Sequence, residues 1–185
     1  MFEALKEIDQ RLLVWGNSFH TDFMDGIMFH LTEFWWWIPL FSWWIFELYK
    51  VYRKKLLTIL IYAVIMVITV DQLTNLIKNM VKRFRPTHNL MLQNKIHIVN
   101  NYYGGPYGYL SSHAANVFAV AVFIFFLTQS IHNKVFKASL FIWALFICYT
   151  RIYLGVHYPF DLFSGAIFGA FMAYLFYKII YKFNL

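Results

Sequence analysis

The sequence predicts an all-α integral membrane protein in which an amphipathic interfacial helix precedes about five transmembrane helices in one bundle. Of its 185 residues, 61% are hydrophobic and only 14% are charged, whereas soluble domains average about 25% charged residues. Five apolar segments also approach the roughly 20 residues that a helix needs to cross a bilayer. No linker-like tract divides them, so we expect a single domain over residues 1–185. The segments are residues 26–49, 56–77, 112–129, 137–154 and 160–181.

The first element is expected to lie along the membrane surface. Apolar residues recur there at spacings of three and four, on one side of a helix whose other side is charged. Glu3, Glu7 and Asp9 interrupt the segment, so we do not expect a signal peptide. Such a helix is typical of the membrane interface. Its apolar residues are Phe2, Leu5, Ile8, Leu12 and Trp15.

The formal charge of +7 is divided among segments that flank the membrane, which favours anionic lipid over nucleic acid as a partner. Loops rich in Lys and Arg stay on the cytoplasmic side, so we expect three of these segments inside and the N-terminus outside. The three segments contain Lys50, Arg53, Lys54 and Lys55; Lys134 and Lys137; and Lys178 and Lys182.

Three further patterns have structural interpretations. Gly165 and Gly169 form a GxxxG pattern, which favours close packing inside the bundle over dimerisation. Cys148 lies in an apolar run and is expected to be a buried structural thiol. Five tryptophans are expected at lipid-facing and interfacial positions, where aromatic rings are enriched. They are Trp35, Trp36, Trp37, Trp43 and Trp44.

A polar stripe follows the second predicted span. Its members are spaced four, three, four and three residues apart, which places them on one helical face. Pro86 is expected to end this helix at Arg85. Lys82 and Arg83 are interpreted as cations that extend to the membrane surface from a helix end. The stripe consists of Asp71, Asn75, Lys78, Lys82 and Arg85.

A long loop over residues 89–109 then leads to the third predicted span. Loops of this length are uncommon unless they are functional or disordered. Ser111 can cap the following helix, which leaves the backbone N–H groups of Ser112 and His113 free to attract an anion such as phosphate.

The stretch TRIYLGVHYPFD joins the last two predicted spans. Arg151 falls in the last turn of one helix, and Gly155 can end that helix. Pro159 suits the first position of the next helix, so Asp161 lies in its first turn and can reach back to His157. A carboxylate that accepts a hydrogen bond from one imidazole nitrogen leaves the other nitrogen free as a nucleophile or base.

The order of the spans brings these polar groups to one outer face. Converging cations would repel one another unless an anion joined them, and a phosphate group fits that requirement. The two histidines supply a nucleophile and a general acid. The groups are Lys78 with Arg85, Ser111 with His113, and Arg151 with His157 and Asp161.

Three stretches, KNMVKRFRP, LSSH and TRIYLGVHYPFD, resemble the signature motifs of the type-2 phosphatidic acid phosphatase family, which shares a helical core with the vanadium haloperoxidases. The first motif has Lys, six residues and then Arg-Pro; the third has Ser-Arg, five residues, His, three residues and Asp. The resemblance covers about residues 70–170. The matching residues are Lys78, Arg85 and Pro86 in the first motif and Thr150, Arg151, His157 and Asp161 in the third.

The second motif of the family, Pro-Ser-Gly-His, is matched less fully. Ser111 and His113 agree with it, whereas Leu110 replaces the proline and Ser112 the glycine. The backbone N–H of Ser112 is still expected to donate to a phosphate.

The resemblance implies phosphoester or diphosphate hydrolysis without a metal ion or other cofactor, through a phosphohistidine. On this chain His157 would attack phosphorus, Asp161 would orient it, and His113 would protonate the leaving oxygen and then activate water. The phosphoryl oxygens would be held by Lys78, Arg85, Ser111, Ser112 and Arg151.

The substrate is expected to be a lipid phosphate. The compact chain resembles the small bacterial undecaprenyl diphosphate phosphatases, which implies an active site on the outer face of the cell (inner) membrane. Members of the family also cleave phosphatidylglycerophosphate, phosphatidic acid and lipid A phosphates, so these substrates are alternatives.

Two other functions remain open. A binder or transporter of lipid phosphates would need the cations but not the two histidines and the aspartate. A metal hydrolase could use His113, His157 and Asp161 as ligands, although the surrounding cations disfavour a divalent ion. The other histidines are expected to be satisfied or solvated, with His88 the one nearest a motif. They are His20, His30, His88, His97 and His132.

Overall fold

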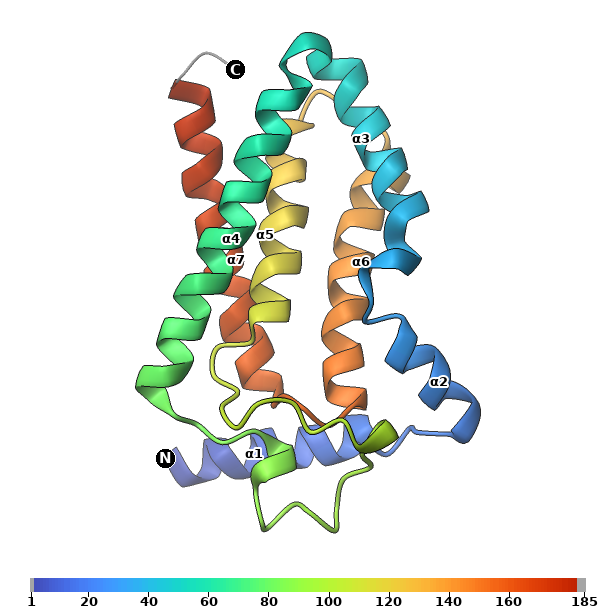
Figure 1. Cartoon of the computed structure of the whole chain (residues 1–185), viewed down its shortest axis with the longest axis vertical. Helices are drawn as coiled ribbons and strands as arrows, with labels where there is room; N and C mark the ends of the chain where they lie inside the picture. The colour runs from blue at the N-terminus through green and yellow to red at the C-terminus, as the bar shows by residue number, and fades with distance from the viewer. Residues whose placement is uncertain (1, 183–185) are drawn as a thin grey trace.

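The computed structural model describes residues 2–182, with Phe2 described by its backbone alone. Five helices run side by side along the long axis, and α1 (Phe2–Asn17) crosses one end of them almost at right angles (Figure 1). The prediction of an all-α membrane bundle with an interfacial helix is confirmed. The five helices are α3 (Ile38–Tyr52), α4 (Leu56–Val81), α5 (Ser112–Leu127), α6 (Lys134–Tyr153) and α7 (Pro159–Lys182).

Within residues 2–182, three helical stretches are long and apolar enough to cross a membrane, while Ser112–Leu127 is apolar but shorter. The first stretch, Phe34–Val81, contains α3 and α4, which turn back at Arg53–Lys55 (η2). This turn and the end of α7 lie at the end of the bundle opposite α1 (Figure 1). Within the described residues, α1 and the end of α7 therefore lie at opposite ends of the bundle. The other two stretches are Lys134–Tyr153 and Pro159–Lys182.

The helix α1 has two faces with different surroundings. The apolar face predicted to enter the membrane is exposed, with Leu12 44% and Trp15 65% accessible; the side chain of Phe2 lies outside the described residues. A narrower strip beside this face packs on the bundle, where Asp9 and Leu13 are fully buried. The helix α1 thus connects the membrane interface to the interior of the bundle.

The first predicted span, residues 26–49, is wrong in its boundaries. A separate short helix, α2 (Asp22–His30), takes up the first residues of this span, and the chain continues after a break in the 3₁₀ turn η1 (Phe34–Trp37) and α3. Glu33 is extended at the start of η1, and Pro39 occupies the first turn of α3, where proline's missing N–H costs no helical hydrogen bond. The membrane segment therefore begins about eight residues later than its hydropathy indicates.

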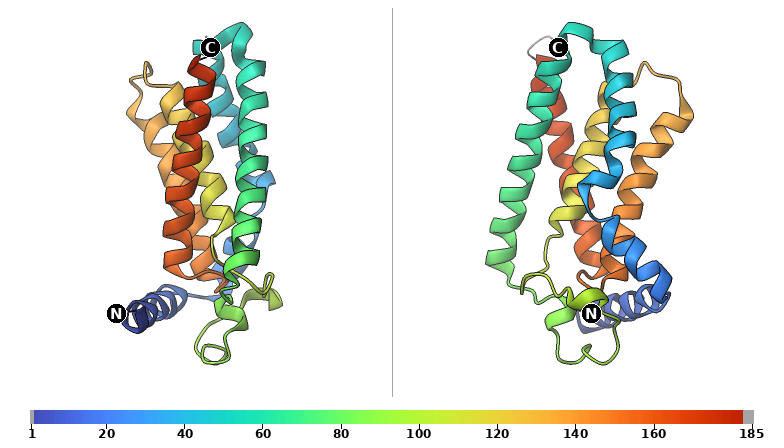
Figure 2. Two further views of the ribbon diagram at one scale, coloured as in Figure 1. Left: turned by 90° about the vertical axis from the view of Figure 1, so that its left-hand side faces the viewer. Right: turned by 45° about the vertical axis from the view of Figure 1, so that its right-hand side comes forward.

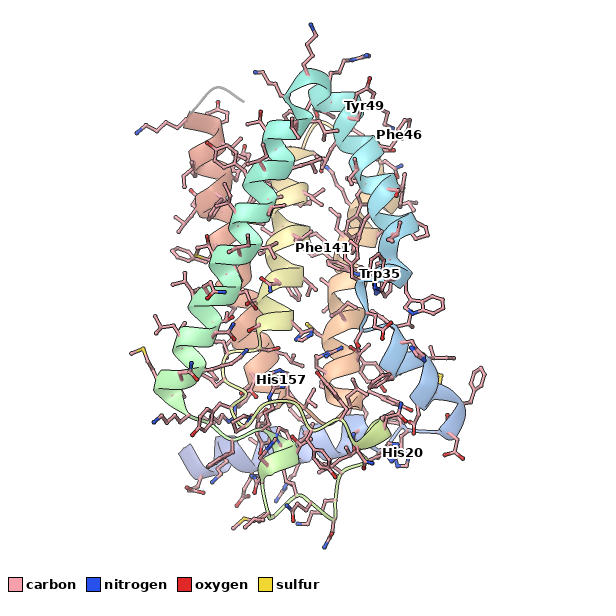
Figure 3. The ribbon with its side chains drawn as sticks, viewed as in Figure 1. His20, Trp35, Phe46, Tyr49, Phe141 and His157 are labelled. Carbon is pink, nitrogen blue, oxygen red and sulfur yellow. The ribbon has the colours of Figure 1, made fainter. Side chains whose placement is uncertain are left out.

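The tryptophan prediction is correct for part of the cluster. Trp35 and Trp36 are 72% and 59% exposed, and Figure 3 shows Trp35 on the outer surface of the bundle. In contrast, Trp44 is only 2% exposed, and its indole N–H donates to Ser139 Oγ at 3.0 Å. Trp44 therefore packs α3 on α6 instead of facing lipid.

The helix α4 ends earlier than predicted. It stops at Val81, and Lys82 takes the left-handed conformation with φ 52°. The next residues are extended, with Phe84 bridged to Tyr107. Only the first three residues of the predicted stripe therefore share a helical face, whereas Arg85 reaches the site from an extended segment. Lys82 is exposed as predicted, but Arg83 is not a free surface cation, because its ion pairs turn it inward.

The helix α5 lies at the centre of the bundle and contacts α4, α6 and α7 (Figure 2). Its closest neighbour is α7, where a Cβ atom on Gly165 would come within 2.6 Å of Ser111 O, and one on Gly169 would overlap Ala115 O. The GxxxG pattern therefore serves internal packing, as predicted. Cys148 is a buried free thiol, also as predicted.

The loop over residues 89–109 is packed against the end of the bundle. Leu92 and Val99 are buried, and His97 exchanges two hydrogen bonds with the side chain of Asn17. The His97 ring also contacts Asp25 at 2.7 Å and stacks on His20. These contacts satisfy His97 and fix the loop to α1 and α2.

Candidate active site

The candidate site lies at the end of the bundle that α1 and the 89–109 loop cover. His157 lies there between the helix ends and the crossing loop (Figure 3). Gly155, with φ 68°, ends the turn after α6, and Pro159 begins α7. This short connection holds His157 fully buried between two helices.

Asp161 is held rigidly in the first turn of α7. Its Oδ1 accepts a hydrogen bond from Arg83 at 2.5 Å, and its Oδ2 accepts one from the Tyr158 N–H at 3.1 Å. The same Oδ2 lies 3.6 Å from Nδ1 of His157. The carboxylate therefore faces the imidazole as the sequence predicts, although the separation exceeds hydrogen-bonding distance.

The geometry assigns the tautomer of His157. Arg85 Nη1 lies 3.0 Å from His157 Nε2. Arginine can only donate, so Nε2 accepts, and the proton of the neutral ring is on Nδ1, towards Asp161. Burial lowers the pKa of His157 well below its usual range, and the charges of Arg85 and Lys78 lower it further. His157 therefore presents an unprotonated Nε2.

The sequence did not reveal the partner that fixes Asp161. Arg83 also pairs with Asp9 of α1 at 2.6 Å and lies over the Tyr158 ring at 4.2 Å. Burial opposes the charge of Arg83, but Asp161 and Asp9 outweigh it and raise the pKa of the guanidinium. Asp9 in turn accepts the N–H of Phe160 in α7. The surface helix is thus linked to the imidazole through two carboxylates and one arginine.

The residues of the stripe on α4 form a hydrogen-bonded chain. Asp71 accepts from Asn75 at 3.0 Å, and Asn75 accepts from Lys78 at 3.2 Å. Lys78 also donates to Ser112 Oγ at 2.5 Å, and this hydroxyl contacts Thr74 at 2.7 Å. The serine that departs from the family motif therefore positions Lys78 through its side chain, a role that only the three-dimensional contact reveals.

Ser111 has mainly a structural position. Its hydroxyl caps α5 by accepting the Ala114 N–H at 3.4 Å, as predicted, and its N–H donates to the Asp161 carbonyl at 3.1 Å. The side chain is fully buried. Ser111 therefore ties the start of α5 to the start of α7, with the free N–H end of α5 beside the site.

Arg151 and His113 form the other side of the site. Arg151 is 1% exposed, and its Nη1 lies 3.3 Å from His113 Nε2. Its Nε donates to Thr150 at 3.2 Å, but its Nη2 is buried without a hydrogen-bond partner. His113 is the accessible member of the pair. A buried, unpaired guanidinium nitrogen is rare in folded proteins and indicates a missing acceptor.

The glycine at the end of the long loop closes the site. A Cβ atom on Gly108 would lie 3.1 Å from Asp161 Oδ2 and 3.2 Å from Arg85 Cγ. Only glycine allows the loop to approach both groups at this distance. The same loop accepts hydrogen bonds from Arg85 through Pro106 O and Tyr107 O.

The eight residues predicted from the sequence thus come together at one end of the bundle. Three of these residues are cations, namely Lys78, Arg85 and Arg151, and within residues 2–182 none of them forms an ion pair with a carboxylate. The same part of the chain contains no group of three or more His, Cys, Asp or Glu side chains placed to hold a metal ion. The arrangement offers donors to an anion with three oxygens, one neutral imidazole and a second, accessible imidazole.

Comparison with known proteins shows which sequences and folds the chain is similar to. The sequence profile of the PAP2 superfamily matches residues 56–185. The chain is 36% identical to a lipid A 4'-phosphatase of Bacteroides thetaiotaomicron, over 98% of this chain and 81% of the relative. It is 27% identical to a lipid A 4'-phosphatase of Porphyromonas gingivalis, over 96% of this chain and 75% of the relative.

Two crystal structures share the fold. One is the transmembrane PAP2 type phosphatidylglycerolphosphate phosphatase from Bacillus subtilis, with a TM-score of 0.72, 20% identity, and coverage of 97% of this chain and 87% of that one. The other is Aquifex aeolicus LpxE, with a TM-score of 0.66, 24% identity, and coverage of 91% and 94%.

Proposed function

The chain belongs to the PAP2 superfamily, and on that premise we propose that this membrane lipid phosphatase removes a phosphate group from a lipid of the lipid A type through a phosphohistidine on His157. The family prediction made from the three motifs is confirmed by the profile match. The observation that carries the proposed chemistry is the buried Arg151, whose Nη2 makes no hydrogen bond. Lys78 and Arg85 lie in the same site beside His157, so three cations surround a position that an anion such as phosphate would fill.

In the first step, His157 Nε2 attacks phosphorus, and the bond between phosphorus and the lipid oxygen breaks. His113 enters this step protonated, gives its proton to the leaving oxygen and becomes neutral, so the lipid departs as an alcohol. Arg85 contacts Nε2 at 3.0 Å before substrate binds. When the phosphate binds, the same N–H donates its hydrogen bond to a phosphoryl oxygen instead. Asp161 stabilises the imidazolium that forms as Nε2 becomes bonded to phosphorus.

In the second step, His113 accepts a proton from water, and the resulting hydroxide attacks phosphorus. The P–N bond breaks, its electron pair returns to Nε2, and inorganic phosphate leaves. Both steps develop negative charge on the equatorial oxygens, where fixed donors lower the barrier most. The donors are Lys78, Arg85, Arg151 and the start of α5 at Ser112, which Ser111 holds in place as its cap.

The substrate proposal rests on the relatives. Two proteins that align with nearly the whole chain are lipid A 4'-phosphatases, which favours the lipid A alternative over undecaprenyl diphosphate. The basic segment Lys50–Lys55 lies at the end of the bundle opposite the site. By the positive-inside rule, this favours a site on the outer face of the cell (inner) membrane.

The test compares phosphate release from lipid A, undecaprenyl diphosphate and phosphatidylglycerophosphate by the purified protein in detergent. We expect the highest kcat/KM for lipid A and no loss of activity in excess chelator. His157→Ala should abolish release, while His132→Ala, at an exposed position in the α5–α6 loop, should not. Near-normal turnover by His157→Ala contradicts the mechanism, and a preference for another lipid contradicts only the substrate.

A further inference from the structure

The helix α1 crosses beneath the ends of α6 and α7 and contacts both (Figure 1). The contacts come from one strip of the helix, because residues three or four apart lie on the same side. The other acidic residues of α1, Glu3 and Glu7, are exposed. The buried members of the strip are Asp9, Leu13, Gly16 and Asn17. The helix is therefore held on the bundle by a narrow strip with a polar side chain at each end.

At one end of the strip, Asp9 joins the groups assigned to the chemistry. Its Oδ1 accepts the Phe160 N–H at 2.9 Å in the first turn of α7, and its Oδ2 accepts from Arg83 Nη2 at 2.6 Å. The other arm of the same guanidinium donates to Asp161, whose second oxygen faces His157 Nδ1 at 3.6 Å. Asp9 therefore reaches the imidazole through Arg83 and the start of α7.

At the other end of the strip, Asn17 holds the end of α6 and the long loop. Its Nδ2 donates to Tyr153 O at 2.6 Å and to His97 O at 3.0 Å, and its Oδ1 accepts the His97 N–H at 2.6 Å. Tyr153 ends α6, two residues after Arg151. Asp9 and Asn17 are eight residues apart, a helical rise of about 12 Å. The helix α1 thus spans the connection between α6 and α7 that carries the nucleophile.

The face of α1 beside this strip is apolar and open. An apolar face of this kind enters the interface of a bilayer, where burial of its side chains adds to the contacts that keep the helix in place. Its members are 43%, 48%, 44% and 65% exposed, and they are Leu5, Ile8, Leu12 and Trp15. Because the strip on the bundle is narrow, the position of α1 depends on what covers this face.

We propose that Asp9 is a positioning residue for the reaction, and that α1 holds it in place when the apolar face of the helix is seated in the membrane. The seated helix keeps one arm of Arg83 on Asp9, so the other arm keeps Asp161 behind His157. When the helix lifts, Arg83 loses one partner and turns more freely, and the nucleophile is less well oriented. Turnover is therefore fastest when α1 lies on a bilayer. This inference rests on the proposed phosphatase activity and extends it to the surroundings in which the enzyme works.

The first test is the kinetic effect of Asp9→Asn in protein reconstituted into phosphatidylcholine vesicles. The substrate is a glucosamine 4-phosphate with two short acyl chains that dissolves as monomers, so its delivery does not depend on the membrane. The amide keeps the size of the side chain but loses its charge. We expect kcat to fall about tenfold to a hundredfold with little change in KM, because a small misplacement of a reacting group costs rate. Glu3→Gln, at an exposed position on the same helix, should change neither constant.

The second test removes the membrane contact without touching the site. Ile8→Ser combined with Leu12→Ser makes the apolar face polar, and kcat on the same soluble substrate should fall about threefold to tenfold with KM unchanged. Leu57→Ser combined with Ile61→Ser removes two exposed apolar side chains, also four residues apart, from α4 and should not change kcat. Adding Asp9→Asn to the α1 face variant should give no loss beyond that of Asp9→Asn alone, because both act through one contact.

The non-additivity separates positioning from a merely structural role. An unchanged kcat for Asp9→Asn would overturn the proposal, and so would losses that multiply when Asp9→Asn and the α1 face variant are combined. If Asp9→Asn does not fold, the α1 face variant decides alone, since a kcat equal to that of the α4 control would overturn the proposal. Failure of the wild-type protein to release phosphate from this substrate and from lipid A would instead contradict the proposed function on which the inference rests.

Discussion

Two arginines, Arg83 and Arg151, lie at the same end of the bundle but have opposite surroundings. Arg83 is neutralised by Asp9 and Asp161, two carboxylates that are fully buried. Arg151 is equally enclosed, but its neighbours among the described residues are His113, Thr150 and the side chain of Tyr102 and include no carboxylate, and its Nη2 makes no hydrogen bond. The first arrangement satisfies its charges within the protein, whereas the second requires an acceptor from outside.

The difference separates positioning from binding. A buried charge is costly unless it is paired, so Arg83 stabilises the fold and fixes the carboxylate behind His157. The unpaired cations are destabilising without ligand, and a bound phosphate would remove that cost. Stability and activity should therefore respond differently when each arginine is removed.

The largest effect is expected for Arg83→Met. It leaves two buried carboxylates without a counter-ion, which typically costs about 3 to 5 kcal/mol, so Tm in detergent should fall sharply and activity with it. Arg83→Lys should recover only part of the lost stability and activity, because an ammonium group lacks the planar, forked donors with which the guanidinium binds both carboxylates. Arg11→Met removes an exposed pair with Glu7 and should change stability by at most about 1 kcal/mol. An unchanged Tm for Arg83→Met would abolish the distinction between the two arginines.

Arg151→Leu should show the opposite balance. Losing one fixed donor to a transition-state oxyanion costs about 2.7 to 4 kcal/mol of barrier, or roughly 10² to 10³ in kcat. Its Tm should be unchanged or higher, since an unpaired buried charge is removed. Lys54→Leu, exposed at the opposite end of the bundle, provides the control. A large loss of stability with little loss of turnover would show that Arg151 is structural.

Gly108→Ala tests the close contact of the 89–109 loop with Asp161, the carboxylate that Arg83 holds behind His157. The added methyl would lie 3.1 Å from Asp161 Oδ2, and Arg83 and Tyr158 hold that carboxylate in place. We expect about a tenfold fall in kcat with little change in KM, because a slightly displaced nucleophile costs rate more than binding. Gly105→Ala, which has open space around it, should be close to wild type. Equal effects of the two substitutions would argue against this role.

The smallest effect is a shift in pH dependence. The pKa of His157 is lowered by burial and then by the nearby cations, so the ring stays neutral below the usual titration range of histidine. The acid limb of the kcat/KM profile should therefore lie at low pH. Removing a positive charge in Arg151→Leu raises the pKa of His157, so the limb should move to higher pH in the residual activity. No movement, or movement to lower pH, would contradict the assignment of His157 as the neutral nucleophile.

The sequence predicted the spans because hydropathy and length depend on local composition. It failed where a few polar residues interrupt an apolar run, as at Glu33, where one predicted span is divided between α2 and α3. It also extended α4 to Arg85, whereas the helix ends at Val81. Just after the end of α4, Arg83 forms ion pairs with Asp9 and Asp161. These contacts join distant parts of the chain, so local periodicity does not reveal them.

The site shows the same limit. Motif spacing identified the residues that the structure brings together, including the cap at Ser111 and the break at Gly155. The missed contacts join distant positions: Arg83 with Asp9 and Asp161, 74 and 78 residues apart. The one local signal is a second strip on α1, where Asp9 and Leu13 lie four residues apart on the side next to the apolar face, and it indicates a buried partner without identifying it.

The most direct test of the account is to identify the phosphorylated residue. The protein should be mixed with a lipid substrate labelled in its phosphate, quenched during turnover under alkaline conditions, and digested for mass spectrometry. The account predicts a phosphoryl group on His157 in the wild-type protein and none in His157→Ala. In His113→Ala the amount of phosphorylated His157 should rise if hydrolysis of the phosphohistidine slows more than its formation. Phosphate release with no label on His157, or a label on another residue, would contradict it.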